Sequence, residues 1–410
     1  MYHWCISDLN NIGKKSREKK LKKGGKKLAS KAEKNTKAMK NPFDFTLCIT
    51  VILLLALGIV MVLSASAPSS LATTGNSYTY VIKQAGFGAL GLVLMFIISK
   101  IDYRIYKKFY KIAYAGSVVA LLLVLVPGIG VSVKGATRWI NLGFGQFQPS
   151  EISKIGLIVF YATYLTEHKD ELNSFWKGFI KPLLFLIPPI AILFFVQDHL
   201  SASIVIISIV CIMMLMAGSR LKYFLTAGVA GVSTALAGML ILAQATGRGN
   251  FRLTRLTTFL DPFADIQGDG WQVVQSLYAI GSGGLFGVGL GESKQKYLYI
   301  PEPHNDFIFA IVAEELGFVG CLVVIALFAV FIWRGILTAM KAPDGFGSLL
   351  AVGITSLIGI QAIINIGVVT SSIPATGMAL PFFSYGGTAL VILLCSVGIL
   401  LNISRAKNKV

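Results

Sequence analysis

The carboxylate of Asp306 is the strongest candidate for chemistry in this sequence. It follows Pro301-Glu-Pro-His-Asn and precedes a long apolar run that begins at Phe307. Ionisable groups beside or within a membrane are costly and tend to mark function, which favours an active-site carboxylate. The alternative is a helix cap, because aspartate is also favoured at helix starts. Position alone does not choose between the two. His304 is a second candidate, and its simpler interpretation is a solvated or hydrogen-bonded loop histidine.

A second cluster combines cations with a carboxylate. Lys134 and Arg138 lie close together, and the segment Gln148-Pro-Ser-Glu151-Ile-Ser-Lys154 follows them. Glu151 and Lys154 are three residues apart, so they share one face of a predicted helix and a local ion pair is the simpler interpretation. In the functional interpretation, Lys154 and Arg138 present positive charge to an anionic headgroup. Arginine matches phosphate geometrically, and lysine acts as a point charge.

A third segment is uncharged and rich in hydroxyl groups and glycine. It runs from Asn365 through Pro374-Ala-Thr-Gly377 to Leu380-Pro-Phe-Phe-Ser384-Tyr-Gly-Gly387. Its side chains and backbone groups could line a polar cavity. They could equally form a turn between two helices, and composition alone favours the turn.

Other patterns are less specific. Arg248, Arg252 and Arg255 could hold phosphate or form a solvated stripe on a helix. The glycines of 281–291 resemble a nucleotide loop but lack the Lys-Ser/Thr ending, so a flexible or closely packed backbone is favoured. The sequence contains no Walker A, HExxH or GxSxG motif. Its five cysteines form no CxxC pair, which predicts neither a disulfide framework nor a metal site.

The elements that must position these residues are membrane helices. Of the 410 residues, 55% are hydrophobic and 14% are charged, whereas about a quarter of a soluble domain is charged. This composition argues against a soluble enzyme, a disordered chain and a coiled coil. The long apolar runs argue against a transmembrane β-barrel, whose strands alternate in polarity. The sequence therefore predicts an all-α polytopic membrane protein.

We predict ten transmembrane helices, because a membrane span needs about 20 mainly apolar residues. The predicted spans are 46–67, 80–99, 109–126, 151–166, 180–196, 201–217, 224–245, 307–333, 347–370 and 388–403. The first run is full length and follows a basic region of 40 residues. An uncleaved span is therefore favoured over a signal peptide.

The distribution of lysine and arginine predicts the orientation. Residues 1–40 contain 13 of the 37 basic residues, and the short loops 68–79 and 371–387 contain none. The positive-inside rule then places both termini in the cytoplasm. No aromatic residues interleave with the lysines of the tail, which argues against nucleic-acid binding and favours a solvated cytosolic tail near anionic lipid.

The predicted organisation has three parts. They are a basic tail at 1–41, a ten-span membrane domain at 42–405 and a cytoplasmic C-terminus at 406–410. Within the membrane domain, a large outer loop covers about 248–305 and is far longer than a connection requires. The three candidate clusters fall on the same outer side, so a lipid-linked anionic substrate would suit this face.

These clusters are also the point at which the chain resembles a known family, the SEDS proteins FtsW, RodA and SpoVE. The resemblance runs from about residue 42 to 405 and rests on several motifs in order. The motifs are Gly135-Ala-Thr-Arg-Trp-Ile-Asn-Leu-Gly143, Gln148-Pro-Ser-Glu-Ile-Ser-Lys154, the segment from Gln272 to Gly287, Pro301 to Phe309 and Asn365 to Thr388.

The resemblance implies a ten-span enzyme of the bacterial cytoplasmic membrane that polymerises lipid II on the outer face. It implies a class B penicillin-binding protein as the crosslinking partner, together with other division or elongation machinery. The family's essential aspartate falls on Asp306, and its Glu and Lys near that aspartate fall on Glu151 and Lys154. Overall likeness favours the FtsW and SpoVE branches, which serve septal or spore-cortex wall synthesis.

One motif departs from the family. Where the family commonly has Glu/Gln-Pro-Asp-Leu-Gly, this chain has Gln197-Asp-His-Leu-Ser201. The proline and glycine are missing and the aspartate is displaced by one position. The role of the family's aspartate therefore does not transfer to Asp198.

The implied chemistry is glycosyl transfer with Asp306 as general base. The predicted substrate-binding residues are Gln148, Glu151, Lys154, Arg138, Arg255, His304 and Ser384. Arg138 and Arg255 are the candidates for stabilising the leaving pyrophosphate, and a divalent cation such as Mg²⁺ or Mn²⁺ is the alternative.

Two other functions remain open at this point. A lipid II flippase or transporter would also need ten spans and a polar cavity, although no repeat symmetry is evident at the midplane. A non-enzymatic scaffold for cell-wall enzymes would leave Asp306 without a chemical role.

Overall fold

The computed structural model describes residues 43–126, 128–133, 136–141, 146–228, 231, 258–264, 266, 268, 270–297 and 299–406. Several predictions fall outside these residues. They concern the basic tail, Lys134, most of the predicted span 224–245, the C-terminus beyond 406 and the arginines Arg248, Arg252 and Arg255.

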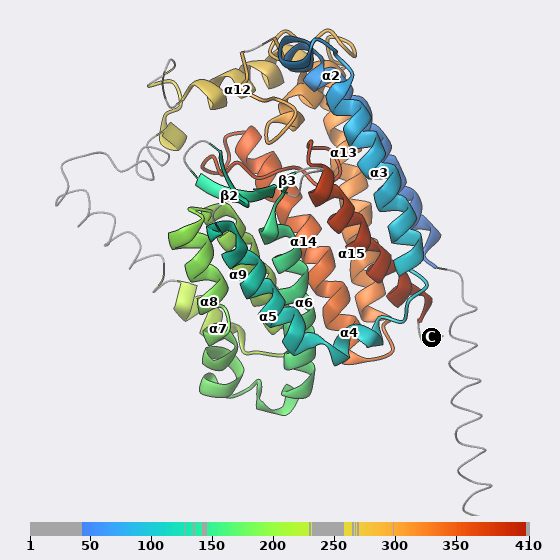
Figure 1. Ribbon diagram of the computed structural model, residues 1–410, viewed down its shortest axis with the longest axis vertical. Helices are drawn as coiled ribbons and strands as arrows, with labels where there is room; N and C mark the ends of the chain where they lie inside the picture. Colours follow the sequence, from blue (N-terminus) through green and yellow to red (C-terminus); the bar gives the residue numbers. More distant parts are fainter. Residues whose placement is uncertain are drawn as a thin grey trace, which may run out of the picture.

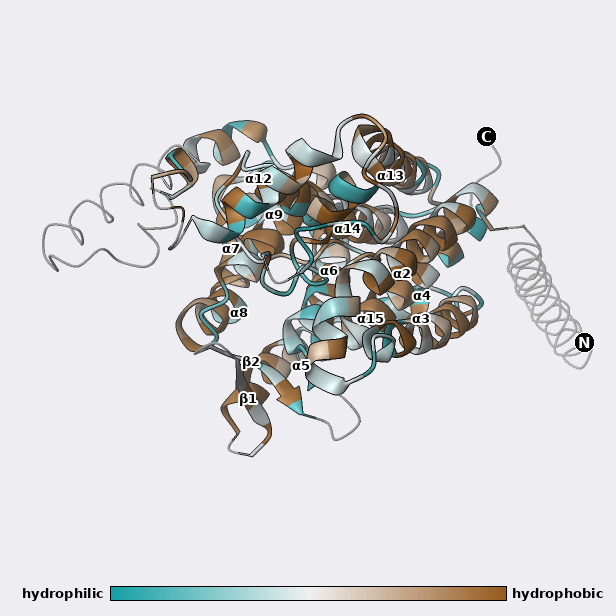
Figure 2. Cartoon of the chain, turned by 90° about the horizontal axis from the view of Figure 1, so that it is seen from above, coloured by the Kyte–Doolittle hydropathy of each residue, from teal (hydrophilic) through white to brown (hydrophobic). Residues whose placement is uncertain are grey.

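The predicted helical fold is confirmed (Figure 1). The helices are α2 (Phe45–Thr74), α3 (Thr79–Ile98), α4 (Arg104–Lys108), α5 (Tyr110–Leu122), α6 (Pro149–Glu167), α7 (Lys181–Leu184), α8 (Ile187–Ala191), α9 (Leu200–Ala217), α12 (Trp271–Gly283), α13 (Ile308–Met340), α14 (Gly345–Val369) and α15 (Gly387–Arg405). Figure 2 shows these helices as mainly hydrophobic.

Seven helical segments among the described residues are long and apolar enough to cross a membrane. They are Phe45–Thr74, Thr79–Ile98, Trp176–Val196, Leu200–Ala217, Ile308–Met340, Gly345–Val369 and Gly387–Arg405. Each coincides with a predicted span. The predicted span 109–126 is a shorter apolar helix, Tyr110–Leu125, and 151–166 is the charged helix α6. The total of ten spans stays a prediction.

Two spans differ from simple helices. Trp176–Val196 is broken into two π-helical turns and the short helices α7 and α8, because Pro182, Pro188 and Pro189 interrupt the backbone ladder. Helix α13 is kinked at Gly317, whose φ of +67° is open to glycine at little cost. A backbone of this kind at membrane depth must be satisfied by its neighbours, and the Tyr161 hydroxyl donates to the Pro182 carbonyl.

A small antiparallel sheet lies in the segment between α5 and α6, and sequence analysis did not predict it. Strand β2 (Ala136–Asn141) pairs with both β1 (Gly130–Val133) and β3 (Gln146–Phe147). The strands contain valine, threonine, tryptophan and isoleucine, which favour extended backbone. The sheet holds the backbone of Arg138, which lies between the predicted spans 109–126 and 151–166.

The helices pack as a bundle around α14. Helix α14 contacts α6, α9 and α13, while α2 packs on α3 and α13, and α3 packs on α15. Small residues allow the closest of these contacts. A Cβ on Gly398 would lie 2.6 Å from the Met95 carbonyl oxygen, so α3 and α15 approach to a distance that only glycine permits.

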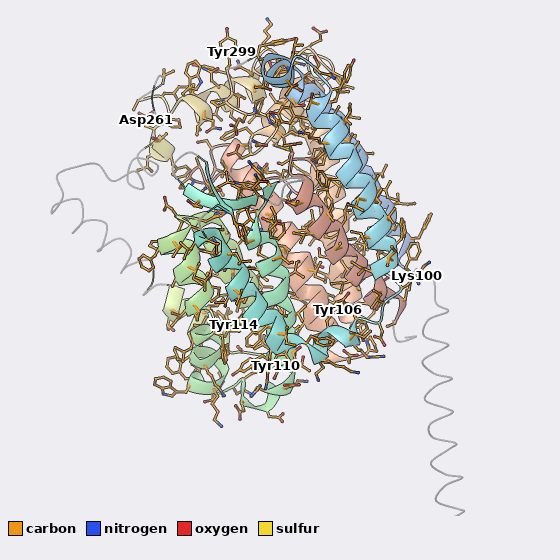
Figure 3. All side chains as sticks on the ribbon, viewed as in Figure 1. Lys100, Tyr106, Tyr110, Tyr114, Asp261 and Tyr299 are labelled. Carbon is orange, nitrogen blue, oxygen red and sulfur yellow. The ribbon has the colours of Figure 1, made fainter. Side chains whose placement is uncertain are left out.

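Loops from distant parts of the chain meet at the two ends of the bundle. We call one the Asp306 end; it holds the sheet, α12, the start of α13 and the loop 370–386. The opposite end, called the Asp344 end, holds the connections 99–103 and 341–344 and the ends of α6 and α15. Figure 3 shows Asp261 and Tyr299 towards the first end and Lys100, Tyr106 and Tyr110 towards the second.

The Asp344 end is held by buried polar pairs. The Arg334 guanidinium binds both carboxylate oxygens of Asp44, at 2.6–3.1 Å, and thereby joins α13 to the start of α2. Asp344 caps α14 and accepts a hydrogen bond from the Tyr103 hydroxyl at 2.6 Å. The Asn402 amide accepts from the Tyr103 N–H and donates to the Ser99 carbonyl, so it fixes the α3–α4 connection to α15.

Candidate functional site

Asp306 lies two residues before the first residue of α13 and is partly exposed. The cap position of α13 is Phe307, one residue after Asp306. Asp306 therefore does not occupy the cap position itself. The carboxylate instead lies against the loop 370–386, where a Cβ on Gly377 would be 3.3 Å from its Oδ2 atom.

The backbone of Asp306 is clamped by a side chain of α14. The Asn365 Nδ2 group donates to the Asp306 carbonyl at 2.7 Å and to the Met378 carbonyl at 2.6 Å. Asn365 is 0% exposed, so both bonds are shielded from water. One buried amide therefore joins the segment that carries Asp306 to the loop beside it. Sequence analysis quoted Asn365 only as the start of a motif.

His304 fixes the same segment from the other side. His304 is 4% exposed, and its ring packs against the rings of Tyr80 and Tyr385, at centroid distances of 4.9 and 5.8 Å. The His304 carbonyl accepts a hydrogen bond from the Tyr385 N–H at 2.8 Å. Burial lowers the pKa of His304, and Glu302 opposes this shift only in part, so the ring is neutral near pH 7. This environment favours a role in holding the loop; contact of His304 with substrate stays a prediction.

The hydroxyl and the carbonyl of Ser384 both take part in hydrogen bonds that hold the loop 370–386. Its hydroxyl accepts a hydrogen bond from the Leu380 N–H at 2.7 Å, and its carbonyl accepts one from the Gln84 side chain at 3.1 Å. The Gln84 amide also accepts from the Gly386 N–H, and Gln84 is 0% exposed. A polar residue of α3 therefore anchors the loop 370–386, and sequence analysis missed it because it lies inside an apolar run. Substrate binding by Ser384 stays a prediction.

Glu151 and Lys154 form an ion pair in the first turns of α6. The Lys154 Nζ atom lies 2.7 Å from Glu151 Oε1, and the Lys154 and Glu151 side chains are 1% and 18% exposed. The local ion pair expected from their spacing is confirmed. Because Lys154 is buried and already paired, its ammonium group is held in one place. Its proposed contact with an anionic headgroup stays a prediction.

Arg138 is fixed by the segment that departs from the family motif. Its Nε and Nη2 atoms donate to the carbonyls of Gln197 and Asp198, at 3.1 and 2.5 Å. Asp198 has a φ of +47°, a left-handed conformation that aspartate tolerates better than most residues. Gln197 and Asp198, which lie in the segment that departs from the family motif, thus form a turn. The carbonyl groups of this turn accept hydrogen bonds from Arg138 of β2.

His199 connects this turn to α6 and α9. Its Nδ1 atom accepts from the Ala202 N–H at 3.3 Å and caps α9, while its Nε2 atom lies 2.8 Å from the Gln148 amide nitrogen. Burial, reinforced by the positive charges of Arg138 and Lys154, lowers the pKa of His199 to about 3. With Nδ1 as the acceptor, the neutral ring carries its proton on Nε2, so it can bond Gln148 only through the oxygen of that amide. Sequence analysis missed His199, because only the fold brings it to Gln148.

The glycine-rich segment 281–291 packs against the kink of α13. A Cβ on Gly287 would lie 2.1 Å from the Glu315 carbonyl oxygen, so the closely packed alternative is correct. Beyond it, Lys296 is paired with Glu315 at 3.0 Å, with side chains 4% and 0% exposed. Lys296 also donates to the Ser64 hydroxyl of α2. Sequence analysis did not foresee this buried pair, which anchors the segment leading to Asp306.

Two predicted contributions find no support in the described residues. Arg255 falls outside them. Within the described ranges, no group of three or more His, Cys, Asp or Glu side chains could hold a metal ion. The divalent cation that was the alternative to the arginines stays a prediction.

Several known proteins are similar to this chain. A family model named FTSW_RODA_SPOVE and described as "Cell cycle protein" matches residues 45–409. Stage V sporulation protein E of Bacillus subtilis (strain 168) is 42% identical over 362 residues, covering 88% of this chain and 97% of that protein. A probable peptidoglycan glycosyltransferase FtsW of Geobacter sp. (strain M18) is 40% identical, covering 88% of this chain and 96% of that protein.

Two solved structures have a similar fold. The rod shape determining protein RodA of Thermus thermophilus has a TM-score of 0.64 and 27% identity, covering 90% of this chain and 98% of that one. A chain from a structure described as "Structural coordination of polymerization and crosslinking by a peptidoglycan synthase complex" has a TM-score of 0.72 and 28% identity, covering 88% of this chain and 98% of that one.

Proposed function

Because this chain belongs to the FtsW/RodA/SpoVE family of cell cycle proteins, we propose that it is a peptidoglycan glycosyltransferase that polymerises lipid II into β-1,4 glycan strands. The observation that carries the proposal is the placement of Asp306. Its backbone is clamped by Asn365, its carboxylate lies beside Gly377, and it is partly exposed. A carboxylate held in this way, and still reachable, suits a general base.

In the proposed step, Asp306 accepts the proton of the 4-hydroxyl of the acceptor GlcNAc. The hydroxyl oxygen forms a bond to the anomeric carbon of the donor MurNAc. The bond from that carbon to undecaprenyl pyrophosphate breaks, and its electron pair leaves with the pyrophosphate. A single displacement without a second nucleophile inverts the anomeric centre, so an α-linked donor gives a β-linked product.

The cations of the Asp306 end would stabilise the charge on the leaving group. The guanidinium of Arg138 is the best-placed candidate among the described residues, because the carbonyls of Gln197 and Asp198 fix its position. Arg255 is proposed for the same role from the sequence alone. Gln148, Glu151 and Lys154 are proposed to line the substrate site, where His199 lies beside Gln148.

The protein is a multi-pass membrane protein. We propose that the Asp306 end faces outwards from the bacterial cytoplasmic membrane, in accordance with the distribution of basic residues. The proposed partner is a class B penicillin-binding protein, supported by the structural likeness to a peptidoglycan synthase complex. The likeness to both SpoVE and FtsW supports a role in spore-cortex or septal wall synthesis.

The test is polymerisation of labelled lipid II by the purified protein in complex with its penicillin-binding partner. The Asp306→Asn variant should give no glycan while its thermal stability and partner binding match the wild type. The matched control is Asp261→Asn, which makes the same change at an exposed aspartate and should polymerise normally.

Two results would contradict the proposal. Substantial polymerisation by Asp306→Asn would refute Asp306 as the base. A wild-type complex that is fully assembled but makes no glycan from authentic lipid II would favour a flippase or a scaffold, and lipid II translocation in vesicles would separate those two.

A further inference from the structure

One buried amide controls the position of the Asp306 segment. Asn365 lies in the last two turns of α14, is 0% exposed, and donates to the carbonyls of Asp306 and Met378. These two carbonyls belong to segments more than 70 residues apart in the sequence. The amide therefore joins the start of α13 to the loop 370–386 directly at the candidate base.

The loop joined in this way leaves space for the Asp306 carboxylate. Gly377 has a φ of +64°, and a Cβ at this position would lie 3.3 Å from Asp306 Oδ2. That separation is tighter than an ordinary van der Waals contact between a methyl group and an oxygen. A side chain at position 377 would push against the carboxylate that the Asn365 bonds hold in place.

We propose that Asn365 is a positioning residue for the base, and that Gly377 is required because any side chain there would displace the Asp306 carboxylate. The inference rests on the proposed function, since it assigns these residues to the transfer step. Neither residue needs to touch the substrate. Asn365 fixes where the carboxylate can lie, and Gly377 keeps that position open.

The expected size of the effect follows from geometry. A misplacement of about 1 Å in a catalytic group costs roughly a hundredfold in rate. Asn365→Asp keeps the volume of the side chain but replaces its NH₂ group with an oxygen, so the two carbonyls can no longer both receive a hydrogen bond. The Asp306 segment then loses the clamp that joins it to the loop at Met378.

The chain offers a matched control for this change. Asn402 of α15 is also buried, at 8% exposure, and also bridges a connection to a helix, but it lies at the Asp344 end. Asn402→Asp removes the bond to the Ser99 carbonyl without touching the Asp306 end. A purely structural role for Asn365 predicts that the two variants behave alike once differences in stability are allowed for.

Gly377 has a control of its own. Gly75, at the end of α2, has a φ of +72°, and no atom lies within 4 Å of the position that a Cβ would take there. Alanine at Gly75 and alanine at Gly377 therefore suffer similar backbone strain. Only the alanine at 377 meets the Asp306 carboxylate.

The experiment measures kcat and the KM for lipid II in the purified complex with the penicillin-binding partner, well below each variant's unfolding temperature. Asn365→Asp should lower kcat about a hundredfold, with KM and partner binding unchanged. Gly377→Ala should lower kcat by a smaller factor, because a contact of 3.3 Å displaces the carboxylate by only a few tenths of an ångström. Asn402→Asp and Gly75→Ala should keep kcat within about twofold of the wild type at similar losses of stability.

The outcomes separate this inference from the proposed function. If Asp306→Asn is inactive while Asn365→Asp and Gly377→Ala keep the wild-type kcat, the positioning role is wrong and the base assignment stands. If Asp306→Asn polymerises normally, both fail. Should Asn365→Asp not fold, the pair Gly377→Ala and Gly75→Ala decides, and equal kcat values for those two would overturn the inference.

Discussion

The two ends of the helical bundle differ in how their polar side chains are hydrogen-bonded. At the Asp344 end, Asp44, Asp344 and Asn402 each make at least two hydrogen bonds, and the buried atoms without a partner near this end are Tyr164 Oη and Arg405 Nε. At the Asp306 end, several buried polar atoms have no partner among the described residues. They are Gln197 Oε1, His304 Nδ1, Asn365 Oδ1 and Thr376 Oγ1.

We interpret this difference between the two ends as a division between residues that stabilise the fold and residues that serve activity. Leaving a buried polar group without a hydrogen bond costs about 1–3 kcal/mol. The Asp306 end therefore contains buried polar groups that cost stability. The pairs of the Asp344 end hold α2, α3, α13 and α15 together. We therefore expect substitutions at the Asp306 end to change activity and substitutions at the Asp344 end to change stability alone.

The largest effect is expected for Glu151→Gln at the Asp306 end. It leaves the ammonium of Lys154, which is 1% exposed, without its counter-charge. Removing one partner of a buried pair typically costs about 3–5 kcal/mol. Both the unfolding temperature and polymerisation per folded molecule should fall. Lys154→Met should cost less stability, because Glu151 is 18% exposed and keeps contact with water; a larger loss for Lys154→Met would contradict this account.

A stability loss of similar or slightly smaller size is expected for Arg334→Met at the Asp344 end. Asp44, whose side chain is 0% exposed, loses the guanidinium that binds both of its oxygens. The cost should be about 3 kcal/mol, measured as a lower unfolding temperature in detergent. Polymerisation per folded molecule should match the wild type. A lower kcat in this variant would show that the two ends are coupled and that the division between them is wrong.

The titration of His199 should contribute to the way the free energy of unfolding depends on pH. Its native pKa of about 3 lies below the ordinary 6.5, so the unfolded state binds more protons between these values. The contribution is fully present above pH 6.5 and is lost as the pH falls towards 3. The slope is at most about 1.4 kcal/mol per pH unit. His199→Asn, which can still cap α9, should flatten the decline of unfolding temperature between about pH 6.5 and pH 4.5; an unchanged slope would refute this.

The smallest effect is expected for Arg104→Met at the Asp344 end. Arg104 binds Asp344 at 3.1 Å, but the two side chains are 46% and 35% exposed. Exposed ion pairs contribute about 0–1 kcal/mol because water and salt screen them. Asp344 also keeps its bonds from Tyr103 and Gly347. Unfolding temperature and polymerisation should both stay close to the wild type. If Arg104→Met loses about as much stability as Arg334→Met, the exposure of an ion pair does not determine how much it stabilises this protein.

Most of the fold could be predicted from the sequence, because the hydropathy of a run and its flanking charges are local properties. The spans at 46–67, 201–217 and 347–370 each match a helix of the structure. The small sheet was not predicted, since short strands within a glycine-rich segment give a weak signal. The broken segment Trp176–Val196 was predicted as one helix despite its prolines, because its hydropathy is continuous.

The helical membrane class and the Glu151–Lys154 pair could be read from the sequence, since each depends on composition or on a spacing of a few residues. The choice of Asp306 as base rested on the family resemblance and stays a prediction. The surroundings of Asp306 could not be read from the sequence, because they depend on the tertiary structure. Asn365 is 59 residues from Asp306, and His199 is 51 residues from Gln148. Such contacts arise from the way the helices pack and bring their loops together. No local pattern encodes them, and they decide where the carboxylate lies.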